Sequence, residues 1–99
     1  MAEGAIILET VVRQAPGVVL RRVAGEILLI PVKGKVADLQ RIFVLNAVGE
    51  RIWGGLVHPR PLRELVDDIA ATYDVTRETA ESDAREFVAE LLEAGLATL

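Results

Sequence analysis

The stretch RIFVLNAVGERIWGGL, residues 41–56, contains the change of pattern on which the fold depends. Residues 41–45 are rich in β-branched and aromatic side chains, which favours a short strand. Asn46 follows directly and is a good helix N-cap, because its side chain can accept a hydrogen bond from a free amide of the first turn. Beyond it, apolar residues recur at helical spacing at Val48, Ile52, Trp53 and Leu56. We therefore expect a strand that passes directly into a helix.

Two further strands are predicted before this stretch. Residues 18–23 and 26–32 are aliphatic and β-branched runs, and the Ala24-Gly25 step between them predicts a tight hairpin turn. Pro31 cannot donate a ladder hydrogen bond, so it should lie at the end of the second strand. Three sequential strands predict a meander, whose edge strands leave backbone groups unpaired unless something covers them. One edge is therefore a candidate binding surface.

Helices are predicted for the rest of the chain. The prolines at 59 and 61 end the first helix, and Pro61 is well placed to begin the second. Apolar residues of the second helix recur from Leu62 to Tyr73. Thr76 can cap a third and longest helix, and Gly95 supplies its C-terminal stop. Strands followed by helices predict an α+β fold, with helices on one face of a small antiparallel sheet.

The first 17 residues fit no single element. Their apolar residues suit either a helix or a strand, and Pro16-Gly17 ends whichever forms. We therefore divide the chain into an N-terminal segment of uncertain order, 1–17, and one domain, 18–99. A chain of 99 residues that is 52% hydrophobic has room for a single core.

Composition narrows the classes of function. Residues 1–60 carry 8 basic and 5 acidic side chains, whereas residues 61–99 carry 3 basic and 10 acidic ones. The acidic half would repel phosphate backbones and anionic lipids, which argues against nucleic acid and membrane partners. No apolar run is long enough to cross a bilayer and no signal peptide is recognisable, so we expect a cytoplasmic protein.

No catalytic, cofactor or metal site is predicted. Cysteine is absent, which excludes disulfides and thiolate chemistry. The acids Glu64, Asp67 and Asp68 fit a solvated helix face better than a metal site, because adjacent helical residues point about 100° apart. His58 is the single histidine, and no serine near it completes a nucleophile arrangement. We expect no active site.

Several short patterns, in this order, resemble one known family. They are Gly25-Glu26-Ile27-Leu28-Leu29, Leu45-Asn46-x-x-Gly49-x-x-Ile52-Trp53, Leu62-x-x-Leu65, Tyr73-Asp74-Val75 and Asp83-x-x-x-Phe87-x-x-x-Leu91-x-x-x-Gly95-Leu96. Together they resemble the PqqD family over about residues 18–97. The connection 33–40 looks longer than is usual in that family, and residues 1–17 match nothing in it.

The resemblance implies a winged-helix-like domain, in which a three-stranded antiparallel sheet is followed by a three-helix bundle. Such domains are recognition elements for ribosomally made peptides, and they work beside a radical-SAM or other peptide-modifying enzyme. Pyrroloquinoline quinone biosynthesis is one pathway, and many members of the family work in others. In the family the leader of the precursor peptide adds as an extra strand beside the third strand, facing the third helix. The residues implied here are Leu39, Gln40, Arg41, Ile42, Phe43, Val44, Leu45, Arg85, Glu86, Ala89 and Glu90.

Other interpretations stay open at this stage. The strand at 41–45 is by sequence alone better read as a core strand covered by helix, with Ile42 and Val44 on one face and Phe43 on the other. A winged-helix DNA-binding regulator is a second alternative, which the six acids and two bases of the third helix oppose. A structural subunit that docks on a partner without binding a leader is a third. A homo-oligomer also stays open.

Overall fold

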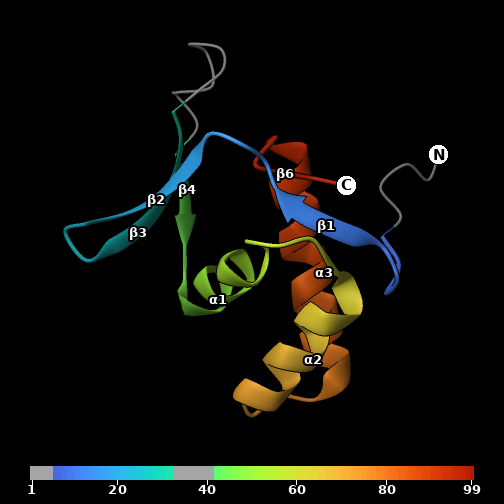
Figure 1. Cartoon of the computed structure of the whole chain (residues 1–99). Helices are drawn as coiled ribbons and strands as arrows, with labels where there is room; N and C mark the ends of the chain where they lie inside the picture. The colour runs from blue at the N-terminus through green and yellow to red at the C-terminus, as the bar shows by residue number, and fades with distance from the viewer. Residues whose placement is uncertain (1–5, 33–41) are drawn as a thin grey trace.

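The computed structural model describes residues 6–32 and 42–99 (Figure 1). Residues 33–41 lie outside the described part, and they include three of the predicted peptide-binding residues, Leu39, Gln40 and Arg41. The elements are β1 (Val11–Gln14), β2 (Val18–Val23), β3 (Glu26–Pro31), β4 (Phe43–Leu45), α1 (Ala47–Gly55), β5 (Arg60–Pro61), α2 (Leu62–Thr72), α3 (Arg77–Glu93) and β6 (Ala97–Thr98).

The predicted meander forms one sheet, in the order β2-β3-β4 and antiparallel throughout. Ala24 and Gly25 both have positive φ, 52° and 84°, as a two-residue hairpin turn requires. Pro31 ends β3 and pairs with Val18, as expected for a residue without an amide hydrogen. In Figure 1 the β2–β3 hairpin projects to one side, and β4, which pairs with β3, leads into α1.

A second sheet, in the order β5-β1-β6, joins distant parts of the chain. Val11 pairs with Pro61 on one side of β1, and Arg13 pairs with Thr98 on the other. The N-terminal segment, for which the sequence left helix and strand open, therefore contributes the central strand of this sheet. Val12 is completely buried there.

Local caps set the helix boundaries as predicted. The Asn46 side chain accepts a hydrogen bond of 2.7 Å from the Gly49 amide, and Thr76 accepts one of 3.1 Å from the Thr79 amide. Pro61 is the N-cap of α2, and Gly95 follows α3 with a φ of +79°.

The core lies between the β2-β3-β4 sheet, the β1 strand and the three helices. Trp53 of α1 is 4% exposed, and the Gln14 side chain donates a 2.8 Å hydrogen bond to the Trp53 carbonyl oxygen. Ala80 and Ala84 of α3 are both fully buried. Because their side chains are small, neighbouring elements can approach the α3 backbone closely. This core confirms the α+β class and the predicted order of sheet and helices. The winged-helix term fits loosely, because the β5-β1-β6 sheet is added.

Within the described residues, no helix has the length and apolar character that crossing a membrane requires.

Candidate functional site

β4 is an edge strand of the first sheet. Phe43 and Val44 pair with Leu29 and Leu28 of β3, and no strand in the described part of the chain pairs with the other side of β4. Among the described residues, nothing pairs with its outer backbone groups, which is the arrangement that an added strand requires.

The two faces of β4 differ in exposure. Leu45 is 5% exposed and faces the core, whereas Val44 and the preceding Ile42 are 57% and 52% exposed. Phe43 lies on the inner face and contacts Phe87 of α3 edge to face, with ring centroids 6.0 Å apart. The core-strand interpretation therefore holds for one face of β4, and the prediction that Phe43 lies opposite Ile42 and Val44 is confirmed.

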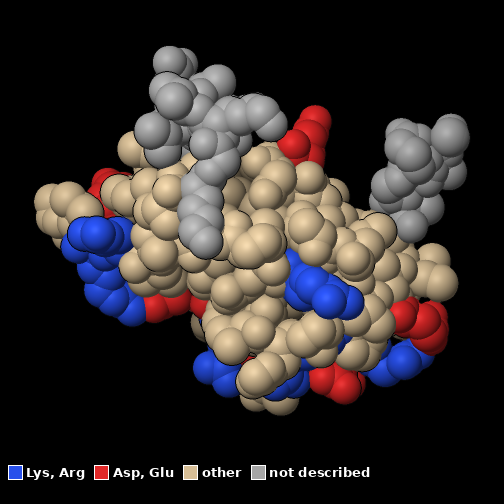
Figure 2. Space-filling model, turned by 45° about the horizontal axis from the view of Figure 1, so that its top comes forward, with Lys and Arg blue, Asp and Glu red and all other residues tan. Residues whose placement is uncertain are grey.

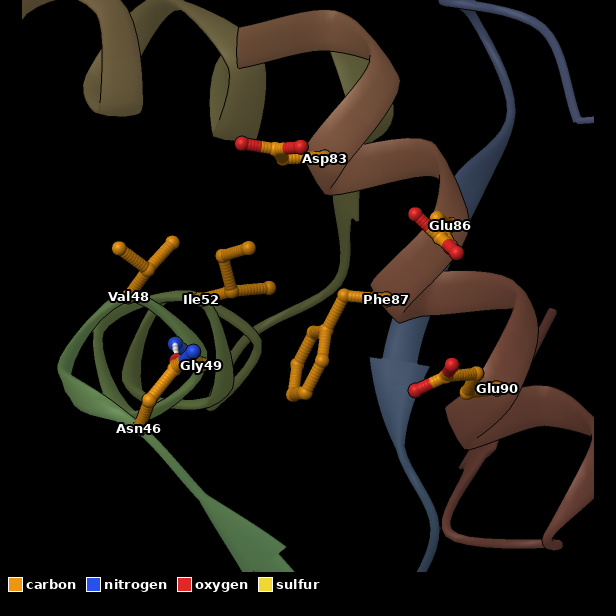
Figure 3. Close-up of a pocket in the computed structure, with 8 residues that line it drawn as sticks. All are labelled: Asn46, Val48, Gly49, Ile52, Asp83, Glu86, Phe87 and Glu90. Carbon is orange, nitrogen blue, oxygen red and sulfur yellow. Dashed lines mark hydrogen bonds between the residues drawn. The ribbon is translucent and has the colours of Figure 1, made fainter. Parts of the chain in front are cut away.

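A cavity of about 390 Å³ lies between α1 and α3, beside the end of β4. We call it the α1–α3 cavity. Figure 3 shows Phe87 reaching from α3 toward α1, with Asp83, Glu86 and Glu90 along the same helix. The lining residues are Asn46, Val48, Gly49, Ile52, Asp83, Glu86, Phe87 and Glu90.

Gly49 allows Phe87 to occupy this position. A Cβ atom on Gly49 would lie 3.1 Å and 3.2 Å from two ring carbons of Phe87, and 3.3 Å from the Asn46 side-chain oxygen. These distances are shorter than nine in ten of the contacts that real Cβ atoms make, so the Phe87 ring would have to shift. The absence of a side chain at position 49 thus brings α1 and α3 together at the wall of the cavity.

Two arginines outside the cavity lining are engaged in ion pairs. Arg85 pairs with Glu81 on α3, and Arg22 of β2 pairs with Glu50 of α1. In the view of Figure 2, basic and acidic side chains lie next to one another along the lower margin of the molecule. In the described ranges, by contrast, no ion pair engages Asp83, Glu86 or Glu90.

A bidentate ion pair joins α1 to α2. Arg51 donates to both carboxylate oxygens of Asp68 on α2, at 2.6 Å and 3.0 Å. These hydrogen bonds hold the pKa of Asp68 below its ordinary value and raise the pKa of Arg51. Asp68 thus links α2 to α1. Its side chain is nearly half exposed, in agreement with the predicted solvated helix face. Within residues 6–32 and 42–99, no group of His, Asp or Glu side chains is arranged to hold a metal ion.

The structure distributes the predicted helix residues over two hollows. Glu86 and Glu90 line the α1–α3 cavity. Arg85 and Ala89 line a second hollow of about 640 Å³ together with Ile6, and Glu86 also borders it. On β4, Phe43 to Leu45 form the open edge strand, and Ile42 directly precedes it.

Sequence reasoning did not assign Asn46, Val48, Gly49, Ile52, Asp83 or Phe87 to the site. Two signals in the sequence could have found three of them, Gly49, Asp83 and Phe87. The four-residue step from Asp83 to Phe87 places both side chains on one face of α3, and the glycine one turn into α1 marks a close approach.

Known proteins share this architecture. A family model described as Coenzyme PQQ synthesis protein D (PqqD) matches residues 25–97. TbiB1, solved in complex with the TbiA(beta) leader peptide, is 33% identical, with a TM-score of 0.69 over 86% of this chain and 93% of that chain. No curated protein matches the chain.

Two more distant structures share the fold. Lasso peptide synthetase B1, complexed with the leader peptide, is 21% identical, with a TM-score of 0.70 over 89% of this chain and 98% of that chain. The PqqD truncation of Methylobacterium extorquens PqqCD, described as a stand-alone RiPP recognition element, is 19% identical, with a TM-score of 0.75 over 100% of both chains. Because the family model covers most of the sequence and agrees with the motifs and the fold, this chain belongs to the PqqD family.

Proposed function

We propose that this protein binds the leader of a ribosomally made precursor peptide and presents it to a modifying enzyme, without catalysing a reaction itself. The observation that carries the proposal is the open edge of β4 beside the α1–α3 cavity. The proposed site also includes residues 39–41, which lie outside the described residues.

Strand addition suits this edge physically. An added peptide would exchange backbone hydrogen bonds with β4, and alternate side chains would point to opposite faces of the enlarged sheet. On the inner face they would approach Phe43, Phe87 and the cavity. Backbone bonds would supply affinity for any extended peptide, and the cavity would select among side chains.

The comparisons support this class of ligand. TbiB1 and lasso peptide synthetase B1 were both solved with leader peptides, and TbiB1 shares a third of its residues with this chain. The non-catalytic role rests on the description of a fold relative as a recognition element.

The partner enzyme is proposed by chemical class only. Leader recognition implies an enzyme that modifies the remainder of the precursor, of the radical-SAM type or another type. Pyrroloquinoline quinone biosynthesis is one candidate pathway, which the name of the matching family model suggests.

DNA binding has weaker support. In a winged-helix regulator the recognition helix enters the major groove, and basic side chains contact the phosphates. The corresponding helix here, α3, carries acids at Glu86 and Glu90 along its exposed face.

An amide-resolved NMR titration tests the proposal. The probe is the synthetic N-terminal half of the short peptide encoded nearest this gene, added to the isotope-labelled full chain. We expect the largest shifts at the β4 amides, at Gly49 and along α3 from Asp83 to Glu90. Val57, which is exposed and lines neither hollow, serves as an internal reference. Shifts confined to β2, or no shift at saturating peptide, would overturn the proposal.

A further inference from the structure

The α1–α3 cavity combines an apolar floor with a row of acids. Val48, Ile52 and the Phe87 ring form the floor, and Ile52 is only 2% exposed. The row consists of the α3 acids at positions 83, 86 and 90, whose spacing of three and four residues places them on one side of the helix (Figure 3).

The acids of this row have no ion-pair partner among residues 6–32 and 42–99. The six ion pairs among the described residues include none of them, although Arg85 lies beside Glu86 in sequence. Like charges at a spacing of four residues, such as Glu86 and Glu90, destabilise a helix. The row thus costs stability in the free protein, and a cation from outside would remove that cost.

The geometry favours a cationic side chain over a metal ion. In the part of the chain that the structure describes, no set of three carboxylates converges closely enough to hold a metal. The cavity volume of about 390 Å³ exceeds what a single ion fills. A lysine or arginine carries several methylenes that cover apolar surface and a charged end that reaches acids.

The cavity is continuous with the edge to which a peptide would add. Asn46, which lines the cavity, directly follows the last residue of β4. At the other end of the strand, Phe43 contacts Phe87 of the cavity wall. A peptide paired with β4 would therefore run past the cavity, and one inward side chain could enter it.

We infer that the α1–α3 cavity selects a lysine or arginine of the bound peptide. Its methylenes lie over Val48, Ile52 and Phe87, and its cationic end faces Asp83, Glu86 and Glu90. This inference rests on the proposed peptide-binding function and adds a charge preference to it.

A selection from a displayed library of random short peptides tests the preference without knowledge of the natural ligand. The full chain is the bait, and the bound peptides are sequenced. We expect Lys or Arg to be enriched at one position, at a fixed spacing from apolar residues. A second selection uses the cavity variant Asp83→Asn/Glu86→Gln/Glu90→Gln, in which that enrichment disappears while the apolar preference stays.

A matched control separates the cavity from overall charge. The variant Glu26→Gln/Asp74→Asn/Glu93→Gln removes the same number of acids outside the cavity lining and keeps the enrichment. Circular dichroism and thermal melting establish that both variants are folded.

A thermodynamic cycle measures the contact directly. One selected peptide is made with its Lys and with Lys→Met, which keeps the apolar stem, and each is titrated against the parent and the cavity variant. Removing the acids should weaken the Lys peptide about fivefold more than the Met peptide at low salt.

The outcomes distinguish the inference from the function on which it rests. Peptides that bind and shift the β4 amides without Lys or Arg enrichment overturn the charge preference and leave the peptide-binding function standing. Enrichment that survives in the cavity variant, or equal weakening of both peptides, also overturns the preference. If no peptide is selected and the encoded precursor does not bind, both proposals are wrong.

Discussion

At the scale of single residues, the wall of the cavity depends on one missing side chain. Gly49 lets the Phe87 ring lie against α1, and the ring in turn contacts Phe43 of the edge strand. Gly49 therefore allows the close packing of α1 against Phe87, and it also shapes the surface that we propose for the peptide.

Gly49→Ala tests this packing against Gly54→Ala in the same helix. A Cβ on Gly54 meets nothing within 4 Å, so that variant should gain about 0.5 kcal/mol in the free energy of unfolding. The Gly49 variant should lose this gain, because the Phe87 ring must move away from the new methyl group. Urea denaturation and the Phe87 ring proton shifts measure both effects. Equal stabilisation with unchanged ring shifts would contradict the proposed contact.

Arg51 controls the ionisation of Asp68. The folded state holds the pKa of Asp68 below its ordinary value, so unfolding raises it. The pair therefore stabilises the fold above the ordinary carboxyl pKa, and this contribution is lost as the pH falls through the folded-state pKa. It is small, since both side chains are nearly half exposed.

We expect Arg51→Met to raise the pKa of Asp68 toward its ordinary value, as measured by NMR titration of the carboxyl carbon. Arg63→Met, which removes the ion pair with Glu9, is the control and should leave the pKa of Asp68 unchanged. An unchanged pKa in the Arg51 variant would show that the hydrogen bonds are not its cause.

At the scale of elements, the boundaries that sequence predicts well are those set by local chemistry. Asn46 and Thr76 cap α1 and α3, and Ala24-Gly25 forms the hairpin turn. Each acts on backbone groups within a few residues, so neighbouring sequence is enough to recognise it.

Thr76→Ala tests the cap of α3. Loss of the hydrogen bond from the Thr79 amide should lower the free energy of unfolding by about 1 kcal/mol. Ser82→Ala is the control, because Ser82 is exposed within α3 and should change stability by less than about 0.5 kcal/mol. Equal stabilities of the two variants in urea would argue against a capping role.

The second sheet shows where local sequence is insufficient. β5 and β6 have two residues each, which is too short for a periodic pattern. β1 pairs with residues about 50 and 85 positions away, so its strand state depends on partners that only the folded chain brings together. The same reason applies to the cavity, whose two walls come from α1 and α3.

At the scale of the whole molecule, β1 pairs with the two strands that flank the α2–α3 pair. It pairs with β5, just before α2, and with β6, just after α3. Gln14 adds a hydrogen bond to the Trp53 carbonyl oxygen of α1. β1 is therefore linked to α1 by this hydrogen bond, and to α2 and α3 through the strands next to them.

Val12→Ala tests how much β1 contributes to the stability of the fold. Val12 is fully buried, so its truncation should cost about 2 to 3 kcal/mol in the free energy of unfolding. Val11→Ala, one residue earlier on the same strand and 42% exposed, should cost less than about 0.5 kcal/mol. Urea unfolding midpoints compare the two variants. A Val12 variant as stable as the Val11 variant would show that β1 does not support the core.

The short length of β4 also affects how the protein behaves among its own copies. An open sheet edge is a template on which identical chains can stack, and long, flat edges favour fibre growth. β4 spans three residues and stops at the Asn46 cap, where the backbone turns away into a helix. It therefore offers only a short edge to a second copy of the chain, whereas a guest strand would gain further contacts from the α1–α3 cavity beside that edge.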